Sequence, residues 1–158
     1  MKTGAEAETA RQLPAIVRRG QLVALGTATD PYQPGEAELG VTRRFLESAA
    51  QLRGLRLGIT TKGAGILRDV ELLQRIHPRS RLSIHVSLIS PHAWLLRRLE
   101  PWAPPPEVRL EVLRRLAQAG LRVGLSLAPI LPGLTDSESD LDALLGAWPP
   151  PACARSPA

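Results

Sequence analysis

Four short apolar segments recur along the chain, and each is followed by a segment of helical periodicity. They span residues 22–26, 55–60, 82–88 and 121–127. Turn-forming residues bound each segment, and such short apolar runs are typical of buried parallel strands. Strands that alternate with helices predict an α/β fold with a parallel sheet and right-handed crossovers. Periodicity alone does not distinguish an open, doubly wound sheet from a partial TIM-type (βα) barrel of about four strands.

The segments between these strands carry apolar residues at helical spacing. In one of them Phe45, Leu46, Ala49 and Leu52 share a face that would pack on the sheet. Further helices are predicted at residues 66–76, 91–99 and 107–119. A last helix should begin near Thr135, because Thr135 and Glu138 have the spacing of a capping box.

The chain is expected to have three parts. Residues 1–20 form an N-terminal helical segment that Pro14 would interrupt, since proline lacks the backbone donor of a helix interior. Residues 21–148 form the partial (βα) core. Residues 149–158, rich in proline and alanine, are expected to be a disordered tail.

The cysteine content excludes some classes of site. Cys153, in the expected tail, is the single cysteine of the 158-residue sequence. The chain therefore has no internal disulfide and no all-cysteine metal site, which favours a reducing compartment. The N-terminus has no apolar signal core and no apolar stretch is long enough to span a membrane, so we expect a cytoplasmic protein without a membrane partner.

The chain has a formal net charge of +5, and arginine supplies nearly all of its cations. Such a charge attracts polyanions in general. The arginines are scattered along predicted helices, however, where a solvated face explains them, and aromatic residues for base stacking are nearly absent. We therefore do not expect a nucleic-acid partner.

Polar residues follow the apolar segments at the end where ligands collect in α/β folds. Thr29 and Asp30 follow the first strand, Lys62 the second, Ser87 ends the third, and Ala128 follows the fourth. Asp30 could accept hydrogen bonds from an amine, Lys62 could meet a carboxylate, and the hydroxyls could bind a ribose. Alternatively, Asp30 begins a turn and Thr29 caps one.

Other motifs fail. No glycine pattern has the spacing of a P-loop or a dinucleotide fingerprint. The three histidines lack metal-site spacing, and His85, in the middle of a strand, is expected to be a hydrogen-bonded structural residue. Ser87, His92 and Asp30 could form a triad on paper, but no nucleophile-elbow sequence supports it.

Four strings in unbroken order resemble bacterial radical S-adenosylmethionine (SAM) proteins related to spore photoproduct lyase. They are LVALGTATDPYQPGE (22–36), ITTKG (59–63), RRLEPWAPPPEVRLEVLRRLAQAG (97–120) and APILPGLTD (128–136). The resemblance implies a partial (βα) barrel of which this chain is the middle part. It places Thr29 and Asp30 near the amino group of SAM, Lys62 and Ser87 near its carboxylate or ribose, and Ala128 beside its adenine. Ser83 or Ser90 would replace Ser87 if the strand register slipped.

The resemblance also implies a [4Fe–4S] cluster held by a C-x-x-x-C-x-x-C motif, which this sequence lacks. We therefore expect the SAM-binding portion of a radical SAM enzyme, with the cluster on a missing N-terminal segment or a second polypeptide. The chain alone should be inactive. The alternatives are a degenerate, non-catalytic scaffold or binding protein and, last, a nucleic-acid-binding protein.

Overall fold

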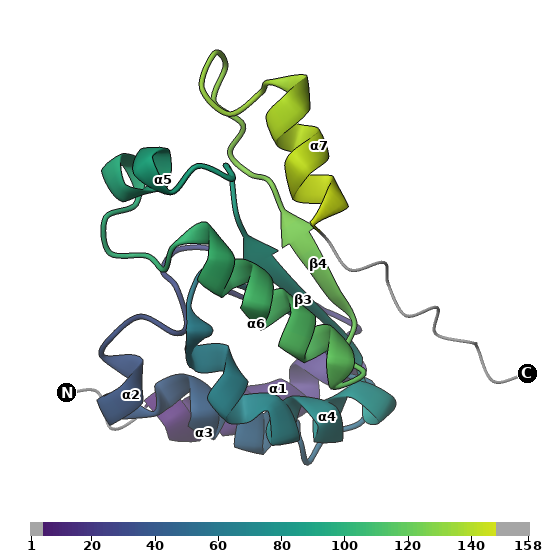
Figure 1. The fold of residues 1–158 in the computed structure, drawn as a ribbon. Helices are drawn as coiled ribbons and strands as arrows, with labels where there is room; N and C mark the ends of the chain where they lie inside the picture. The colour runs from purple at the N-terminus through teal and green to yellow at the C-terminus, as the bar shows by residue number, and fades with distance from the viewer. Residues whose placement is uncertain (1–4, 148–158) are drawn as a thin grey trace, which may run out of the picture.

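A four-stranded parallel sheet organises the chain (Figure 1). The computed structural model describes residues 5–147. The strand order is β1-β2-β3-β4, so neighbours in sequence are neighbours in space. The strands are β1 (Leu22–Leu25), β2 (Arg56–Thr61), β3 (Arg81–Ser87) and β4 (Val123–Ser126). They confirm the four apolar segments predicted as strands.

Helices and 3₁₀ turns connect the strands (Figure 1). The elements are α1 (Ala5–Arg18), α2 (Glu36–Leu39), α3 (Val41–Ala49), η1 (Ala64–Asp69), α4 (Val70–Ile76), η2 (His77–Arg79), α5 (Ala93–Leu99), α6 (Pro106–Gln118) and α7 (Glu138–Gly146). The segment predicted as one helix at 66–76 divides into η1 and α4.

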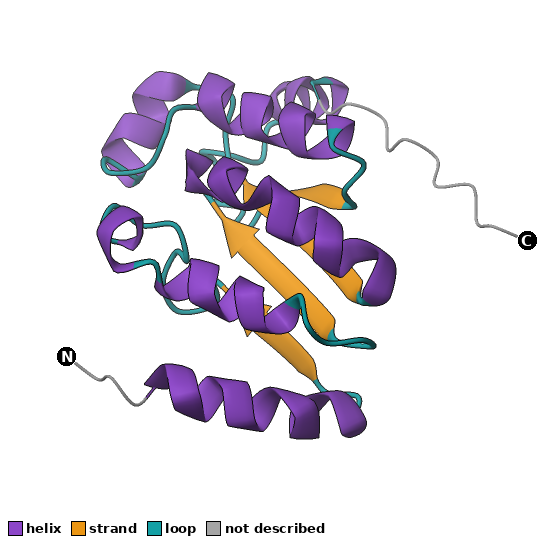
Figure 2. Cartoon of the chain, turned by 90° about the horizontal axis from the view of Figure 1, so that it is seen from below, coloured by secondary structure: helices purple, strands orange, loops and turns teal. Residues whose placement is uncertain are grey.

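The main core lies between the helices and one face of the sheet. Alternate strand residues such as Leu57, Ile59 and Ile84 are fully buried there against α1, α3, α4 and α6. Figure 2 shows helices gathered over one side of the strands. The strand residues that alternate with these, such as Arg56 and His85, face the opposite side of the sheet and are exposed. A doubly wound sheet has helices on both faces, so the one-sided arrangement fits part of a (βα) barrel.

A second, smaller apolar cluster lies where the strands end. It contains the buried residues Leu88, Ile89, Leu96 and Leu144, so it joins the end of β3 to α5 and α7. This cluster holds the loops after β3 and β4 over the carboxyl end of the sheet.

Two details of the helices correct the sequence prediction. The helix α1 runs through Pro14 without interruption, and the neighbouring Leu13 is buried in the main core, whose packing holds the segment helical. The helix α7 begins at Glu138, and its N-cap is Ser137, whose Oγ accepts a hydrogen bond from the Asp140 amide. Thr135 does not cap it, because its buried hydroxyl accepts a hydrogen bond from the Leu131 amide.

The predicted disordered tail at 149–158, with Cys153, lies outside the described residues. Between residues 5 and 147, no helix is long and apolar enough to cross a membrane.

Candidate functional site

A pocket of about 230 Å³ lies at the carboxyl ends of β1, β2 and β3. Its lining consists of Gly26, Ala28, Thr29, Asp30, Thr60, Thr61, Lys62 and Ser87. Four of the five predicted site residues are thus brought together. The fifth, Ala128, lies just beyond β4, and its carbonyl oxygen is 3.5 Å from the Ser87 hydroxyl.

The floor of the pocket depends on Gly26. Its φ is +89°, and a Cβ atom built there would lie 1.9 Å from the carbonyl oxygen of Thr60. Only glycine accepts both the positive φ and the close approach of another backbone. Gly26 therefore lets the chain leave β1 directly against the end of β2.

The Asp30 carboxylate ties the loop after β1 to the end of β2. Its Oδ1 accepts hydrogen bonds from the Tyr32 amide at 2.8 Å and the Thr61 hydroxyl at 2.7 Å, and its Oδ2 accepts one from the Lys62 amide at 2.7 Å. A carboxylate has about four acceptor positions. Asp30 therefore acts as the predicted turn former and retains one position for a ligand.

The rest of this loop is anchored by Glu36, which is buried. Its carboxylate accepts hydrogen bonds from the amides of Val41, Thr42 and Arg43, at 2.8 to 3.3 Å, at the start of α3. A negative charge is favourable at a helix N-terminus. The Thr42 hydroxyl donates in turn to the carbonyl of Pro31 at 2.7 Å, so α3 holds the loop from behind.

A buried ionic network holds the other side of the pocket. The Arg109 side chain has no solvent exposure, and its Nη2 lies 2.6 Å from Glu100 Oε2. Glu100 Oε1 lies 2.6 Å from the Lys62 ammonium. Arg109 also donates to the carbonyls of Pro104 at 2.6 Å and Ser87 at 2.9 Å. The network joins α6 and the loop before it to the ends of β2 and β3.

The network also controls the ionisation of Glu100. Burial opposes the charged form, but the ionic interactions with Lys62 and Arg109 together outweigh it and hold the pKa of Glu100 below its usual value. Lys62 already faces a carboxylate of its own chain. An ammonium has three N–H donors, so a ligand can share it.

The strand register identifies which serine belongs to the pocket. Ser87 is buried at the end of β3 and lines the pocket. Ser83 lies four residues earlier, toward the amino end. Ser90 is fully buried, and its hydroxyl accepts a hydrogen bond from the His92 amide. Neither alternative reaches the pocket.

The histidines do not form a catalytic group with the pocket. His92 Nε2 lies 3.0 Å from Asp140 Oδ1 of α7. His92 therefore pairs with Asp140 and does not form a triad with Ser87 and Asp30. His85 is exposed on the uncovered face of β3 beside Gly124. Within residues 5–147 its side chain makes no hydrogen bond, so the prediction that it is a hydrogen-bonded structural residue is wrong.

The described residues contain no cluster of three or more histidine, cysteine or acidic side chains that could hold a metal ion. The donors around the pocket are hydroxyls, one carboxylate and one ammonium. These groups suit a polar organic ligand with an amine, a carboxylate or a sugar, and they contain no thiolate for an iron–sulfur cluster.

The sequence prediction missed Gly26, Glu36, Glu100 and Arg109. The burial of Arg109 could have been predicted from the sequence. Arg109 lies at helical spacing with Val112, Leu113 and Leu116, on the apolar face of its helix.

Comparison with known proteins gives consistent matches of two kinds. The profile described as "Radical SAM superfamily" matches residues 4–145. An uncharacterized protein of Mycobacterium tuberculosis is 36% identical over 146 residues, which are 92% of this chain and 43% of that protein. An uncharacterized protein of Acidianus two-tailed virus is 32% identical over 130 residues, 80% of this chain and 42% of that protein.

An uncharacterized protein of Methanocaldococcus jannaschii is 25% identical over 140 residues, 87% of this chain and 52% of that protein. The chain thus spans about half or less of the length of these relatives. No solved structure matches it significantly.

Proposed function

The chain belongs to the radical SAM superfamily, and from that premise we propose that it is the SAM-binding portion of a radical SAM enzyme core. The observation that carries the proposal is the pocket at the carboxyl ends of β1 to β3. It gathers Thr29, Asp30, Lys62 and Ser87 in one place, and this end of the strands is where (βα) barrels bind their ligands.

The polar groups around the pocket match those of SAM. The unused acceptor position of Asp30 suits the amino group, and the remaining donors of Lys62 suit the carboxylate. The hydroxyls of Thr29 and Ser87 suit the ribose. The pocket volume of about 230 Å³ is below the roughly 300 Å³ at which ligand pockets usually begin, so the adenine would extend past it toward Ala128.

The residues of this chain do not fit the [4Fe–4S] cluster that the superfamily implies. Cluster irons are bound by cysteine thiolates, and the sequence has one cysteine, Cys153. We therefore assign the cluster ligands to a segment outside this chain or to a second polypeptide. The role of this chain is to bind and orient SAM.

Within the superfamily we propose a spore photoproduct lyase-like protein, on the strings that resemble that group. Asp30 and Glu36 belong to the first string and Glu100 and Arg109 to the third. The structure gives all four a common role, because each fixes a loop at the carboxyl end of the sheet. The second candidate function is a non-catalytic scaffold, which the missing cysteine motif favours.

Calorimetric titration of the chain with SAM tests the proposal. We expect saturable binding, weakened by up to about tenfold in Ser87→Ala, because one neutral hydrogen bond contributes roughly 0.5–1.5 kcal/mol. Ser83→Ala is the matched control, since it removes the same hydroxyl from the same face of the same strand outside the pocket. Absence of binding would favour the scaffold, and an equal loss in the control would refute the assigned pocket.

A further inference from the structure

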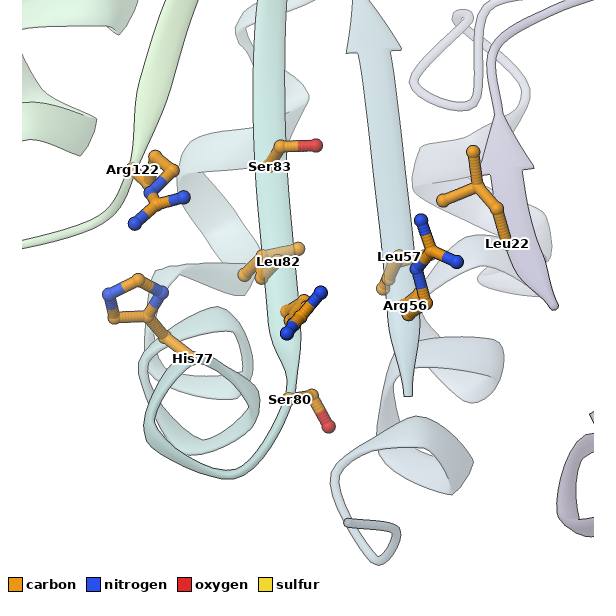
Figure 3. A pocket seen from close by; sticks show the side chains of 9 residues that line it. Leu22, Arg56, Leu57, His77, Ser80, Leu82, Ser83 and Arg122 are labelled. Atoms are coloured by element: carbon orange, nitrogen blue, oxygen red, sulfur yellow. The ribbon is translucent and has the colours of Figure 1, made fainter. Parts of the chain in front are cut away.

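A second pocket, of about 670 Å³, lies at the opposite end of the strands (Figure 3). Its polar lining is Arg56, His77, Ser80, Arg81, Ser83 and Arg122. All of these side chains can donate hydrogen bonds, and no aspartate or glutamate lines the pocket. The pocket is separate from the candidate SAM site, because it opens at the amino ends of β2 and β3.

The strand register places the arginines next to one another. Arg56 and Arg81 are direct partners in the pairing of β2 with β3. Arg122 immediately precedes Val123, which pairs with Ile84, so Arg122 lies opposite Ser83, two residues along β3 from Arg81, and lines the same pocket. Like charges at paired positions of a sheet destabilise it. An anion bound between Arg56 and Arg81 would offset this repulsion.

No such anion is present in the part of the chain that the structure describes. There, the side chains of Arg81 and Arg122 make no hydrogen bond or ion pair, and Arg56 donates one hydrogen bond to the carbonyl of Gly20 at 3.1 Å. Elsewhere, arginines such as Arg43 and Arg109 face a carboxylate at 2.6 Å. This second pocket, called the amino-end pocket below, therefore contains guanidinium N–H groups that have no partner among the described residues.

His77 and Ser80 also line the pocket with polar side chains. The Nδ1 atom of His77 is buried without a hydrogen-bond partner. Figure 3 shows the imidazole of His77 and the guanidinium of Arg122 on one side of the pocket and Arg56 beside Leu22 on the other. The Ser80 hydroxyl accepts a hydrogen bond from the Leu55 amide, which leaves its proton available to a ligand.

We propose that this amino-end pocket binds a small molecule with a di- or triphosphate group. Three guanidiniums match the charge of a phosphate chain, and the planar guanidinium binds phosphate oxygens through two parallel hydrogen bonds. The volume accommodates a phosphate chain together with an organic group, as in an ordinary ligand pocket. A single carboxylate would leave most of the positive charge unpaired.

The test is calorimetric titration with inorganic tripolyphosphate at low ionic strength. We expect binding to the chain, weakened about tenfold in Arg81→Gln and in Arg122→Gln, because hydrogen bonds to charged groups are the stronger kind. Arg97→Gln removes the same charge from the exposed face of α5 and should bind like the unchanged chain. Tripolyphosphate should also raise the melting temperature of the chain, and at the same concentration it should raise that of Arg81→Gln by less.

Several results would overturn the proposal. No binding by the unchanged chain refutes it, as does an equal loss in Arg97→Gln, which would indicate attraction by net charge alone. A single-stranded oligonucleotide or a glutamate-rich peptide that binds more tightly than tripolyphosphate, and depends on Arg81, would identify a different class of partner. Both Arg81 and Arg122 are exposed, so the variants should fold, and their melting curves check this.

Discussion

Replacing Arg109 with methionine should destabilise the chain more than replacing any exposed arginine. The change leaves the Ser87 and Pro104 carbonyls without their donor. It also leaves Glu100, whose side chain is 11% exposed, with one ionic partner instead of two. Methionine fills a similar volume, so the lost polar contacts account for the effect.

The loss of stability in Arg109→Met can be estimated from the contacts that Arg109 makes. Removing one partner of a buried ion pair costs about 3–5 kcal/mol. Lys62 still faces Glu100, so we expect the lower end, about 3 kcal/mol. A domain has about 5–15 kcal/mol of stability in total. At about 2–4 °C per kcal/mol for a chain of this size, the melting temperature should fall by roughly 6–12 °C.

Urea unfolding followed by circular dichroism measures the change. The matched control is Arg115→Met, which also removes an arginine of α6 that faces a glutamate, Glu111, but in solvent. We expect no resolved change there, since exposed ion pairs contribute little. A loss in Arg109→Met no larger than in the control would refute the view that the network holds the carboxyl end together.

Three further changes test other parts of the fold. Gly26→Ala should unfold or strongly destabilise the chain in a thermal melt, whereas Gly146→Ala, with open space around it, should be neutral; equal effects would contradict the close approach at Gly26. Ser137→Ala should cost about 1 kcal/mol in urea unfolding as a lost N-cap, and a neutral result would show that Ser137 does not cap α7. The pKa of Glu100 is lowered from 4.5 in the folded chain, so its ionised form contributes stability above pH 4.5 that is lost as the pH falls through the folded pKa. Glu100→Gln should therefore lose part of the stability at neutral pH and show a shallower decline below pH 4.5 in urea unfolding, and an unchanged slope would contradict the shift.

The strands could be predicted from the sequence because buried parallel strands are apolar along their whole length, whereas their order was left open between a doubly wound sheet and a barrel. All four segments appear within a few residues of their predicted bounds. The same logic placed Thr29, Asp30, Lys62 and Ser87 at one end of the sheet, since parallel strands bring their carboxyl ends together. The one-sided covering by helices then favoured the barrel geometry, which periodicity had left open.

The interactions between distant residues could not be predicted in the same way. The contact of Glu100 with Lys62 joins positions 38 apart in sequence and depends on how the loop before α6 packs. Thr135 and Ser137 are both good N-cap residues, and the choice between them depends on a loop amide that only the folded chain presents. The register of three arginines at the amino end likewise appears only once the strands are paired.

The most direct test of the account is the mapping of SAM by amide chemical shifts in an ¹⁵N-labelled chain. We predict shifts that saturate with SAM and concentrate at Gly26, Thr29, Thr60, Lys62 and Ser87, with Ser83 and Arg122 unaffected. Shifts centred on the amino-end pocket, or none at saturating SAM, would contradict the claim that this chain provides the SAM-binding part of a radical SAM core.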